Sequence, residues 1–394
     1  MNQFMKRFLI ITDDITGAGD TGVTLARLGI PVIVTLKEIE ECQMSCVINT
    51  ESRSLGSEEA YKLISGLDID FDSFDFIVKK VDSTLRGNIA HEILAVDEVY
   101  KPELILFIPA LPELGRTTEG GVHMLNGTPI SKTEIGFDPK TPVREDNLRN
   151  ILQTVYKEAI THFSVEDIEE NRLDFNHGRV FSCDVLINQH MQNAVAAAMK
   201  TGKRILWVGS AGIVDSLLQT IHNTLPAMAL VASISDTTRQ QVKFAEEKGV
   251  PLVVIPWQHL VSRDYKDYIQ NGVDLLQNGM DIIVLPSSSY DRIEFEKSPP
   301  NISGQIQEAM GTIGAAILKK VKVSGIFLTG GDTAMGFFNQ IKANKFSIVS
   351  EVLMGVPLMK AMGTKHETMK IITKAGAFGQ PDTVYYCLRK LKEM

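Results

Sequence analysis

The sequence predicts an α/β protein of two domains, each with a mainly parallel sheet flanked by helices, and with a β-hairpin excursion in the first domain. Short apolar runs alternate with longer amphipathic stretches along the chain, which is the pattern of successive β-α-β units. The length of 394 residues suits two or three domains, since domains usually have roughly 100–200 residues. One long segment, residues 114–142, follows neither pattern.

Short apolar runs mark the strands expected in the first half of the chain, at residues 8–11, 32–36, 46–48, 76–78, 104–108, 180–182 and 206–208. Amphipathic stretches between them predict helices at residues 21–28, 57–65, 89–96, 144–160 and 188–199. Because parallel strands need a long crossover connection, usually a helix, this order favours a parallel sheet.

The segment 114–142 is rich in glycine, threonine and proline and has no helical period. It contains the pair Asn126-Gly127, which is a strong signal for a two-residue hairpin turn. We therefore expect a small β-hairpin excursion here. Loops of this length are often binding loops or lids.

A second α/β set begins near Met228, with strands expected at residues 230–232, 252–255, 282–285, 326–328 and 370–373. Its helices are expected at residues 238–248, 302–320, 334–340 and 382–392. The stretch 221–227 lacks a strong pattern and contains Pro226. The sequence therefore predicts domains at residues 1–225 and 226–394.

The composition excludes several classes of protein. The chain is 44% hydrophobic and 22% charged, with a net charge of −8, whereas a nucleic-acid protein usually shows a basic face. The first apolar run ends at Thr12, too early for the apolar core of a signal peptide, and no run reaches the ~18 residues of a membrane span. We expect a cytoplasmic protein that binds neither nucleic acid nor membrane. Its oligomeric state is open, with a homodimer as one option.

The first chemistry-bearing motif is DDITGAGD at residues 13–20, which follows the first strand and opens a helix. In open α/β sheets, ligands bind beyond the carboxyl ends of strands. There, Asp13 and Asp14 can bind sugar hydroxyls, hold Mg²⁺ through water, or act as a general base. Helix capping explains one aspartate but not the whole run. We take Asp13 and Asp14 as candidate catalytic residues.

The second motif is KKVDSTLRGN at residues 79–88, again between a strand and a helix. It brings together Lys80, Asp82, Ser83, Thr84 and Arg86. An arginine offers a planar fork suited to carboxylate, and a lysine offers a point charge. A substrate with a carboxylate and several hydroxyls would use this set well. The alternative is a solvated polar loop.

A third motif, GRTTEGG at residues 115–121, lies within the irregular excursion. Its Arg116 can contact a substrate anion or a transferring phosphate. A purely structural loop is the competing interpretation.

Two glycine-rich strand ends, TGGDT at residues 329–333 and TKAGAFG at residues 373–379, lie in the second half, and Gly355 lies a little before the latter. Glycines at a strand-to-helix turn let backbone N–H groups approach phosphate, and the helix N-terminus adds positive potential. Asp332 can serve Mg²⁺ or cap the helix. The pattern favours a nucleotide site, although the chain has no P-loop, no GxGxxG after its first strand and no HExxH.

In this order, the motifs resemble the four-carbon acid sugar kinase family, formerly a family of unknown function. The resemblance rests on DDITGAGDTG, KKVDSTLRGN, GRTTEGG, VGSAG at residues 208–212, TGGDT and TKAGAFG. It implies a first domain that binds a sugar acid and a second that binds ATP. The implied reaction moves the γ-phosphoryl of ATP, with Mg²⁺, to the terminal hydroxyl of a four-carbon acid.

The resemblance places substrate contacts at Asp13, Asp14, Arg53, Lys80, Asp82 and Arg86, to which the motifs themselves add Ser83, Thr84 and Arg116. It places ATP contacts at Ser233, Ser235, Gly330, Gly331, Asp332, Thr333 and Gly376. Ser233 and Ser235 resemble a serine-rich turn that opens the nucleotide domain of the family. The glycine usual before that turn is Ala232 in this chain.

The intact run DSTLRGN resembles the D-threonate and D-erythronate kinases more than the 3-oxo-tetronate kinases, although a 3-oxo-tetronate 4-kinase stays an alternative. Alternatives of another class are a sugar-acid dehydrogenase or isomerase, and a non-catalytic sensor of sugar acids. The segment 14–20 is also similar to the anion-hole signature of ribokinase-like kinases. That signature lies late in its family, whereas here it follows the first strand, so we interpret it as local convergence.

Overall fold

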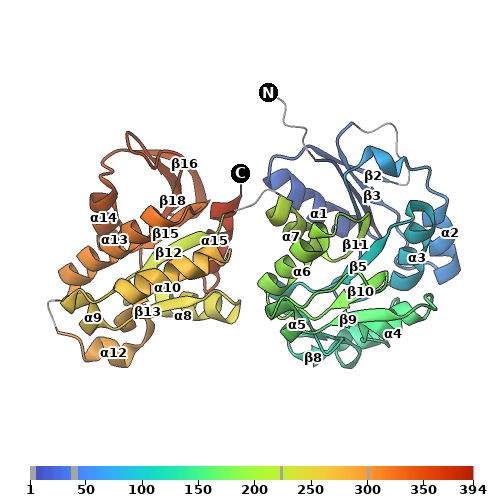
Figure 1. The fold of residues 1–394 in the computed structure, drawn as a ribbon, viewed down its shortest axis with the longest axis horizontal. Coiled ribbons are helices and arrows are strands. Elements are labelled where there is room, and N and C mark those ends of the chain that lie inside the picture. The colour runs from blue at the N-terminus through green and yellow to red at the C-terminus, as the bar shows by residue number, and fades with distance from the viewer. Residues whose placement is uncertain (1–5, 37–42, 222–224, 300–301, 394) are drawn as a thin grey trace. The chain divides into compact units, whose positions relative to one another are not determined.

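The computed structural model describes residues 6–36, 43–221, 225–299 and 302–393. By contacts, the chain divides into two compact units, Met1–Asn223 and Thr224–Glu393. In the described residues, no helix is both long and apolar enough to cross a membrane. The predicted α/β fold, with two sheets flanked by helices, is confirmed (Figure 1).

The described part of the first unit contains one large sheet of eight strands in the order β2-β3-β1-β4-β11-β5-β10-β9. All of its neighbouring strands run parallel. The strands are β1 (Phe8–Thr12), β2 (Val32–Leu36), β3 (Ser45–Asn49), β4 (Phe76–Lys80), β5 (Leu104–Ile108), β9 (Ile160–Phe163), β10 (Val180–Cys183) and β11 (Ile205–Gly209). The central strands β1, β4 and β11 are neighbours, so their carboxyl ends meet at one edge.

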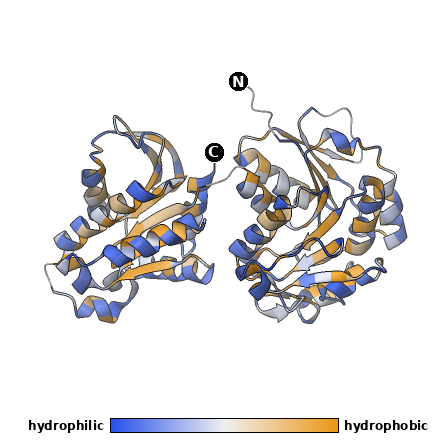
Figure 2. Cartoon of the chain, in the orientation of Figure 1, coloured by the Kyte–Doolittle hydropathy of each residue, from blue (hydrophilic) through white to orange (hydrophobic). Residues whose placement is uncertain are grey.

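Helices cover both faces of this sheet. They are α1 (Ile15–Arg27), α2 (Ser57–Ser65), α3 (Ile89–Tyr100), α4 (Leu148–Gln153), α5 (Val165–Glu169), α6 (Asn188–Lys200) and α7 (Ala211–Ile221). Buried residues of α1, α6 and α7 share one apolar core, and those of α2, α3 and α4 share the other. In Figure 2 the strands between the two helical layers are largely hydrophobic.

The helix predicted over residues 144–160 is wrong for most of its length. The helix α4 has six residues, beginning after the N-cap Asn147, whose side chain accepts from two backbone N–H groups. Beyond it, the side-chain amide of Gln153 donates to the carbonyl of Tyr156, 3.3 Å away, and the chain turns. Ile160 then begins β9, which pairs with β10. Apolar residues recur every four positions from Leu148 onward. This spacing is also typical of a helix, so it led to the wrong prediction.

The excursion folds into a separate sheet of three short strands, β6 (Arg116–Glu119), β7 (Val122–Leu125) and β8 (Thr128–Pro129). The predicted turn at Asn126 and Gly127 joins β7 to β8, and both residues have positive φ, 50° and 76°. This is the geometry that favours Asn-Gly in a two-residue hairpin turn. Short 3₁₀ turns occur at Phe71–Ser73, Pro112–Leu114, Ile130–Lys132 and Glu134–Phe137.

The described part of the second unit contains a sheet of seven strands in the order β13-β14-β12-β15-β18-β17-β16. The strands are β12 (Ala227–Val231), β13 (Leu252–Ile255), β14 (Ile282–Pro286), β15 (Gly325–Thr329), β16 (Phe346–Leu353), β17 (Val356–Ala361) and β18 (Lys370–Lys374). The sheet is parallel from β13 to β18, and β17 and β16 add an antiparallel edge. The sequence did not predict this edge, and Gly355, with φ of 73°, lies in its hairpin turn.

The helices of the second unit are α8 (Asp236–Glu247), α9 (Trp257–Ser262), α10 (Lys266–Gln277), α11 (Ser287–Tyr290), α12 (Arg292–Glu296), α13 (Ser303–Lys320), α14 (Gly331–Ile341) and α15 (Thr383–Lys392). Buried residues of α9, α10, α13 and α14 share one apolar core, and those of α8 and α15 share the other. The carboxyl ends of β12, β15 and β18 therefore meet between two helical layers.

Candidate functional site

Asp13 and Asp14 follow β1 directly, and each has a different environment. Asp14 is the N-cap of α1, and its Oδ1 accepts a hydrogen bond from the backbone N–H of Gly17 at 2.9 Å. Asp13 is almost fully buried, with 2% of its surface exposed. Helix capping, the alternative interpretation of this motif, is therefore present, but it involves only one of the two carboxylate oxygens of Asp14.

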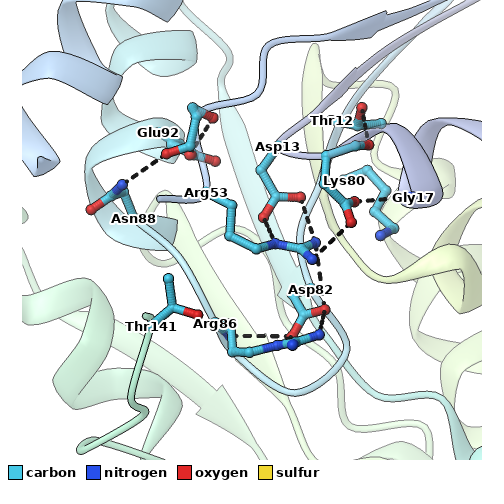
Figure 3. A network of polar contacts seen from close by, with 12 residues as sticks. Thr12, Asp13, Gly17, Arg53, Lys80, Asp82, Arg86, Asn88, Glu92 and Thr141 are labelled. Carbon is cyan, nitrogen blue, oxygen red and sulfur yellow. Dashed lines mark hydrogen bonds and ion pairs between the residues drawn. The ribbon is translucent and has the colours of Figure 1, made fainter. Parts of the chain in front are cut away.

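Arg53 joins the first motif to the second. Its Nε and Nη2 donate to the two carboxylate oxygens of Asp13 at 2.8 and 3.1 Å, and its Nη1 donates to Oδ2 of Asp14 at 2.8 Å. A carboxylate oxygen of Asp82 lies 3.5 Å from Nη2. Burial opposes the charge of Arg53, but Asp13 and the other two carboxylates raise its pKa above the ordinary value. Figure 3 shows Arg53 between Asp13 and Asp82.

Asp82 is held in turn by Arg86, whose Nε and Nη2 donate to its two oxygens at 3.0 and 3.1 Å. The hydroxyl of Thr84 also donates to Asp82. Burial would raise the pKa of Asp82, but the hydrogen bond from Arg86 and the charge of Arg53 hold that pKa well below its ordinary value. This carboxylate is therefore ionised at neutral pH.

The loop that carries Asp82 requires an unusual backbone. Leu85 and Gly87 both have positive φ, 63° and 95°. A Cβ on Gly87 would lie 3.3 Å from Cγ of Arg53 and from Oδ2 of Asp13. Glycine is thus needed here both for the backbone conformation and for the close approach of the two motifs.

Lys80, the last residue of β4, is the cation of the site that has no acidic partner. It is 6% exposed, and within the described residues no hydrogen bond or ion pair is formed by its ammonium group. Burial lowers its pKa, although the charges of Asp13, Asp14 and Asp82 act in the opposite direction. A Cβ on Gly17 would overlap its ammonium nitrogen, so Lys80 lies against the first turn of α1.

These residues surround a cavity of about 680 Å³ in the first unit. Six of the predicted residues line it, namely Asp14, Arg53, Lys80, Asp82, Ser83 and Arg86. Asp13 and Thr84 act from behind the lining, through their hydrogen bonds to Arg53 and Asp82. Arg53 and Arg86 are engaged with carboxylates, so Lys80 is the cation most available to an anionic ligand.

The lining of this cavity differs from the predicted set at Arg116 and at two residues of VGSAG. Arg116 is not among the residues that line this cavity, and its guanidinium donates to the carbonyl of Leu114. The lining includes Ser210 and Ala211, which begin α7 after β11. The sequence had not singled out these two as site residues, although they lie within VGSAG. A glycine-containing turn after a buried strand was the signal that could have found them.

His123 of β7 also connects to this site and was missed. It is fully buried, its Nε2 lies 2.9 Å from the carbonyl oxygen of Ser83, and its Nδ1 lies 2.9 Å from the hydroxyl of Thr118. A carbonyl oxygen can only accept, so Nε2 carries the proton and Nδ1 accepts from Thr118. The hairpin excursion thereby holds the loop of the second motif.

The second unit has its own cavity, of about 300 Å³, at the carboxyl ends of β12 and β15. Its polar lining includes Ser233, Gly330, Gly331, Asp332 and Thr333, and its apolar lining includes Ile234, Phe295, Ile302 and Ile306. Gly330 has φ of 90° and precedes α14. The space beside Gly331 is open, with no heavy atom within 4 Å of a Cβ built there. A glycine turn at a helix N-terminus beside an apolar wall fits a nucleotide.

Ser235 and Gly376 adjoin this cavity rather than line it. The hydroxyl of Ser235 accepts from the backbone N–H of Thr238, as the N-cap of α8, and lies 2.8 Å from the carbonyl oxygen of Gly376. A Cβ on Gly376 would overlap the hydroxyl of Ser233. In the described part of the chain, no group of three His, Cys, Asp or Glu side chains is arranged to hold a metal ion.

The fold and the two cavities define a two-domain α/β protein with a separate polar site in each domain. The chain belongs to the family that combines a sugar-binding N-terminal domain, matched by residues 8–217, with a nucleotide-binding C-terminal domain, matched by residues 228–384. The resemblance that the motifs indicated is thereby confirmed.

Relatives of this chain carry kinase names. It is 27% identical to a D-threonate kinase of Salmonella typhimurium, with 98% of this chain and 99% of that protein covered. It is 24% identical to a D-erythronate kinase of Heliobacterium modesticaldum (98% and 97% covered). It is 22% identical to a 3-oxo-tetronate kinase of Brucella melitensis (95% and 93% covered).

A solved structure has the same fold. It is a domain of unknown function from Bordetella bronchiseptica, a domain-swapped dimer with bound citrate. It covers 98% of this chain and 98% of its own, at 23% identity and a TM-score of 0.57.

Proposed function

We propose that this protein is an ATP-dependent kinase that phosphorylates the terminal (4-)hydroxyl of a four-carbon sugar acid, D-threonate or D-erythronate. Full-length similarity to kinases of these acids supports the proposal. The observation that carries it is Lys80, a buried cation with no acidic partner among the described residues, in a cavity whose polar lining also includes hydroxyls and two arginine–carboxylate pairs. A small acid with several hydroxyls complements that lining.

The carboxylate of the substrate binds Lys80 in this proposal. An ammonium group acts as a point charge for an anion, and burial makes the interaction stronger than it would be in water. The nearby first turn of α1 adds the positive potential of a helix N-terminus. The hydroxyls of the substrate bind the oxygens of Asp82 and the side chain of Ser83, which also line the cavity.

Asp14 orients the attacking hydroxyl and accepts its proton as the new O–P bond forms and the bond to ADP breaks. Asp14 lines the cavity, whereas both oxygens of Asp13 face the guanidinium of Arg53. We therefore assign Asp13 to the positioning of Arg53. Phosphoryl transfer depends chiefly on positioning and charge neutralisation, so a modest base suffices.

The nucleotide binds the second unit, at the turn of Gly330, Gly331, Asp332 and Thr333, with Ser233 beside it. Bound Mg²⁺ would neutralise charge on the phosphates, and it usually keeps several waters and one or two carboxylate ligands. Asp332, in the first turn of α14, is the carboxylate best placed to serve it.

A coupled ADP-release assay with D-threonate, D-erythronate, their L-isomers and 3-oxo-tetronate tests the proposal. We expect ATP- and Mg²⁺-dependent turnover with a D-tetronate as the best acceptor. A preference for 3-oxo-tetronate would favour the related kinase activity. Binding of NADH but not ATP would favour a dehydrogenase. Ligand-induced thermal stabilisation without any ADP release would favour a sensor.

A further inference from the structure

Lys374, the last residue of β18, is a further buried lysine, and the function proposed above does not use it. It is 3% exposed. Its Nζ donates hydrogen bonds to the carbonyl oxygens of Ala375, Gly376 and Phe378, at 2.9, 3.0 and 2.9 Å. All of its donors are therefore directed at the loop that follows its own strand.

The charge of Lys374 has no acidic partner in the described part of the chain. Two other lysines of this protein differ, since Lys79 pairs with Glu92 and Lys392 pairs with Asp281, each at 2.8 Å. A buried charge without a counter-ion is costly, and burial lowers the pKa of Lys374 to about 8. A positive charge is thus held at the carboxyl end of β18 with nothing to neutralise it.

Side chains of α8 hold the same loop from another direction. The hydroxyls of Ser235 and Thr238 both donate to the carbonyl oxygen of Gly376, each at 2.8 Å. The amide of Gln241 donates to the carbonyl oxygens of Phe378 and Gln380, at 2.9 and 3.0 Å. The carbonyl groups of the loop are therefore turned towards Lys374 and α8.

The backbone N–H of Phe378 donates to the carbonyl oxygen of Ala375 at 3.1 Å, whereas the two N–H groups before it, those of Gly376 and Ala377, are not used in this way. Among the described residues, no acceptor for the backbone N–H of Gly376 or Ala377 is present. Successive backbone N–H groups of this kind form concavities that bind anions. The loop thus combines two free amide donors with a nearby cation.

This loop and the cavity of the second unit are one assembly. The backbone N–H of Gly330 donates to the carbonyl oxygen of Lys374 at 2.9 Å. Gly376 packs so closely on Ser233 that any Cβ would overlap the serine hydroxyl. Ser233 and Gly330 both line the cavity. An anion bound there therefore meets the loop that Lys374 organises.

We propose that Lys374 is a positioning residue for the nucleotide phosphates. It turns the carbonyl groups of Ala375, Gly376 and Phe378 away, so that the amides of Gly376 and Ala377 and the positive charge act on the phosphates. The inference rests on the nucleotide site of the proposed function.

The matched test compares Lys374→Met with Lys370→Met. Lys370 lies at the other end of the same strand, and its Nζ also donates to backbone carbonyls, those of Leu391 and Glu393. We expect Lys374→Met to weaken the calorimetric affinity for MgADP by about tenfold or more, since charge-assisted hydrogen bonds are the strong ones. Lys370→Met should change it less than twofold, and neither change should alter binding of D-threonate or D-erythronate. Equal MgADP affinity in both variants would overturn the inference.

Hydrogen exchange of residues 375–380 in the nucleotide-free protein gives a readout that is independent of binding. Lys374→Met should speed exchange in this loop, whereas Lys370→Met should not. Unchanged exchange there contradicts the positioning role. A wild-type protein that binds neither MgADP nor MgATP would instead contradict the nucleotide site itself, so the two failures are distinguishable.

A measurement on the wild-type protein decides the matter if Lys374→Met does not fold. The pKa of Lys374 is about 8, so its charge is lost between pH 7 and pH 9.5, and MgADP affinity should fall over that range. Cys387 of α15 is the titratable group that acts on Lys374, but burial raises the pKa of its thiol to about 12. Flat MgADP affinity from pH 7 to pH 9.5 would count against the inference.

Discussion

Replacement of Gly17 by alanine tests the Lys80 site most directly. Gly17 lies in the first turn of α1, where an added Cβ would overlap the ammonium nitrogen of Lys80 and lie 2.7 Å from Oδ1 of Asp14. Because the end of a lysine side chain is flexible, the ammonium group can swing away while the helix stays in place. The substitution therefore displaces the ammonium group of Lys80, and also shifts Oδ1 of Asp14, without removing either charge.

The expected magnitudes separate function from stability. Alanine is favoured over glycine within helices by about 1 kcal/mol, so Gly17→Ala should cost little stability. A hydrogen bond to a charged group contributes about 1.5–3 kcal/mol, and each 1.4 kcal/mol corresponds to about tenfold in affinity. We expect KM for the sugar acid to rise by roughly ten- to hundredfold and KM for ATP to stay unchanged.

The assay is ADP release at saturating ATP with varied sugar acid, together with thermal unfolding. Gly22→Ala is the matched control, because Gly22 lies in the same helix and its added Cβ would make an ordinary contact, 3.6 Å from Cγ2 of Val34. The control should keep the wild-type KM. An unchanged KM in Gly17→Ala would refute the assignment of the substrate carboxylate to Lys80.

Further predictions concern the base, the hairpin and the nucleotide loop. Asp14→Asn should lower kcat by about a hundredfold, whereas Asp13→Asn should mainly raise KM; steady-state kinetics with equal losses of kcat would contradict this division. Burial lowers the pKa of His123 to about 4, so the unfolded chain takes up the proton first on acidification. Between pH 6.5 and pH 4, the free energy of unfolding should fall by up to about 3 kcal/mol, and urea unfolding of His123→Gln should show a smaller fall. Gly376→Ala, which would overlap Ser233, should weaken calorimetric MgADP binding about tenfold; unchanged binding would separate this glycine from the site.

The central part of the fold was predictable because buried parallel strands are short apolar runs. The runs at β1, β4 and β15 end directly at polar or glycine-rich turns, and each is fully or nearly fully buried. The strands β16 and β17 escaped prediction because they form an antiparallel edge. Serine and glutamate residues interrupt the apolar residues of β16, and four successive residues in its middle are exposed, so no continuous apolar run marks it.

The candidate site was predictable in part for a related reason. Asp14, Lys80 and Asp82 lie at the ends of neighbouring strands, so the order of strands alone brings them to one edge. Arg53 lies on a loop after β3, and its contacts with Asp13 and Asp14 join residues about 40 positions apart. Spacing along the chain cannot reveal such a pair, and the family resemblance supplied it. His123 was not predicted because its partners are the hydroxyl of Thr118 and the backbone carbonyl of Ser83. Every residue has a backbone carbonyl, so the sequence does not show which one a histidine contacts.

The fold separates the side chains of the two adjacent lysines in the second motif, Lys79 and Lys80. Successive side chains of a strand point to opposite faces, so the two lysines at the end of β4 enter different surroundings. Lys79 is fully buried, pairs with Glu92 at 2.8 Å and donates to the carbonyl oxygen of Lys80. Ser52 donates to the same glutamate at 2.6 Å, so this ion pair supports the chain just before Arg53. Lys80, without such a partner, turns to the cavity. Because the charge of Lys79 is neutralised within the core, Lys80 is the lysine of this pair that we propose for anion binding, and Lys79 supports the neighbouring chain.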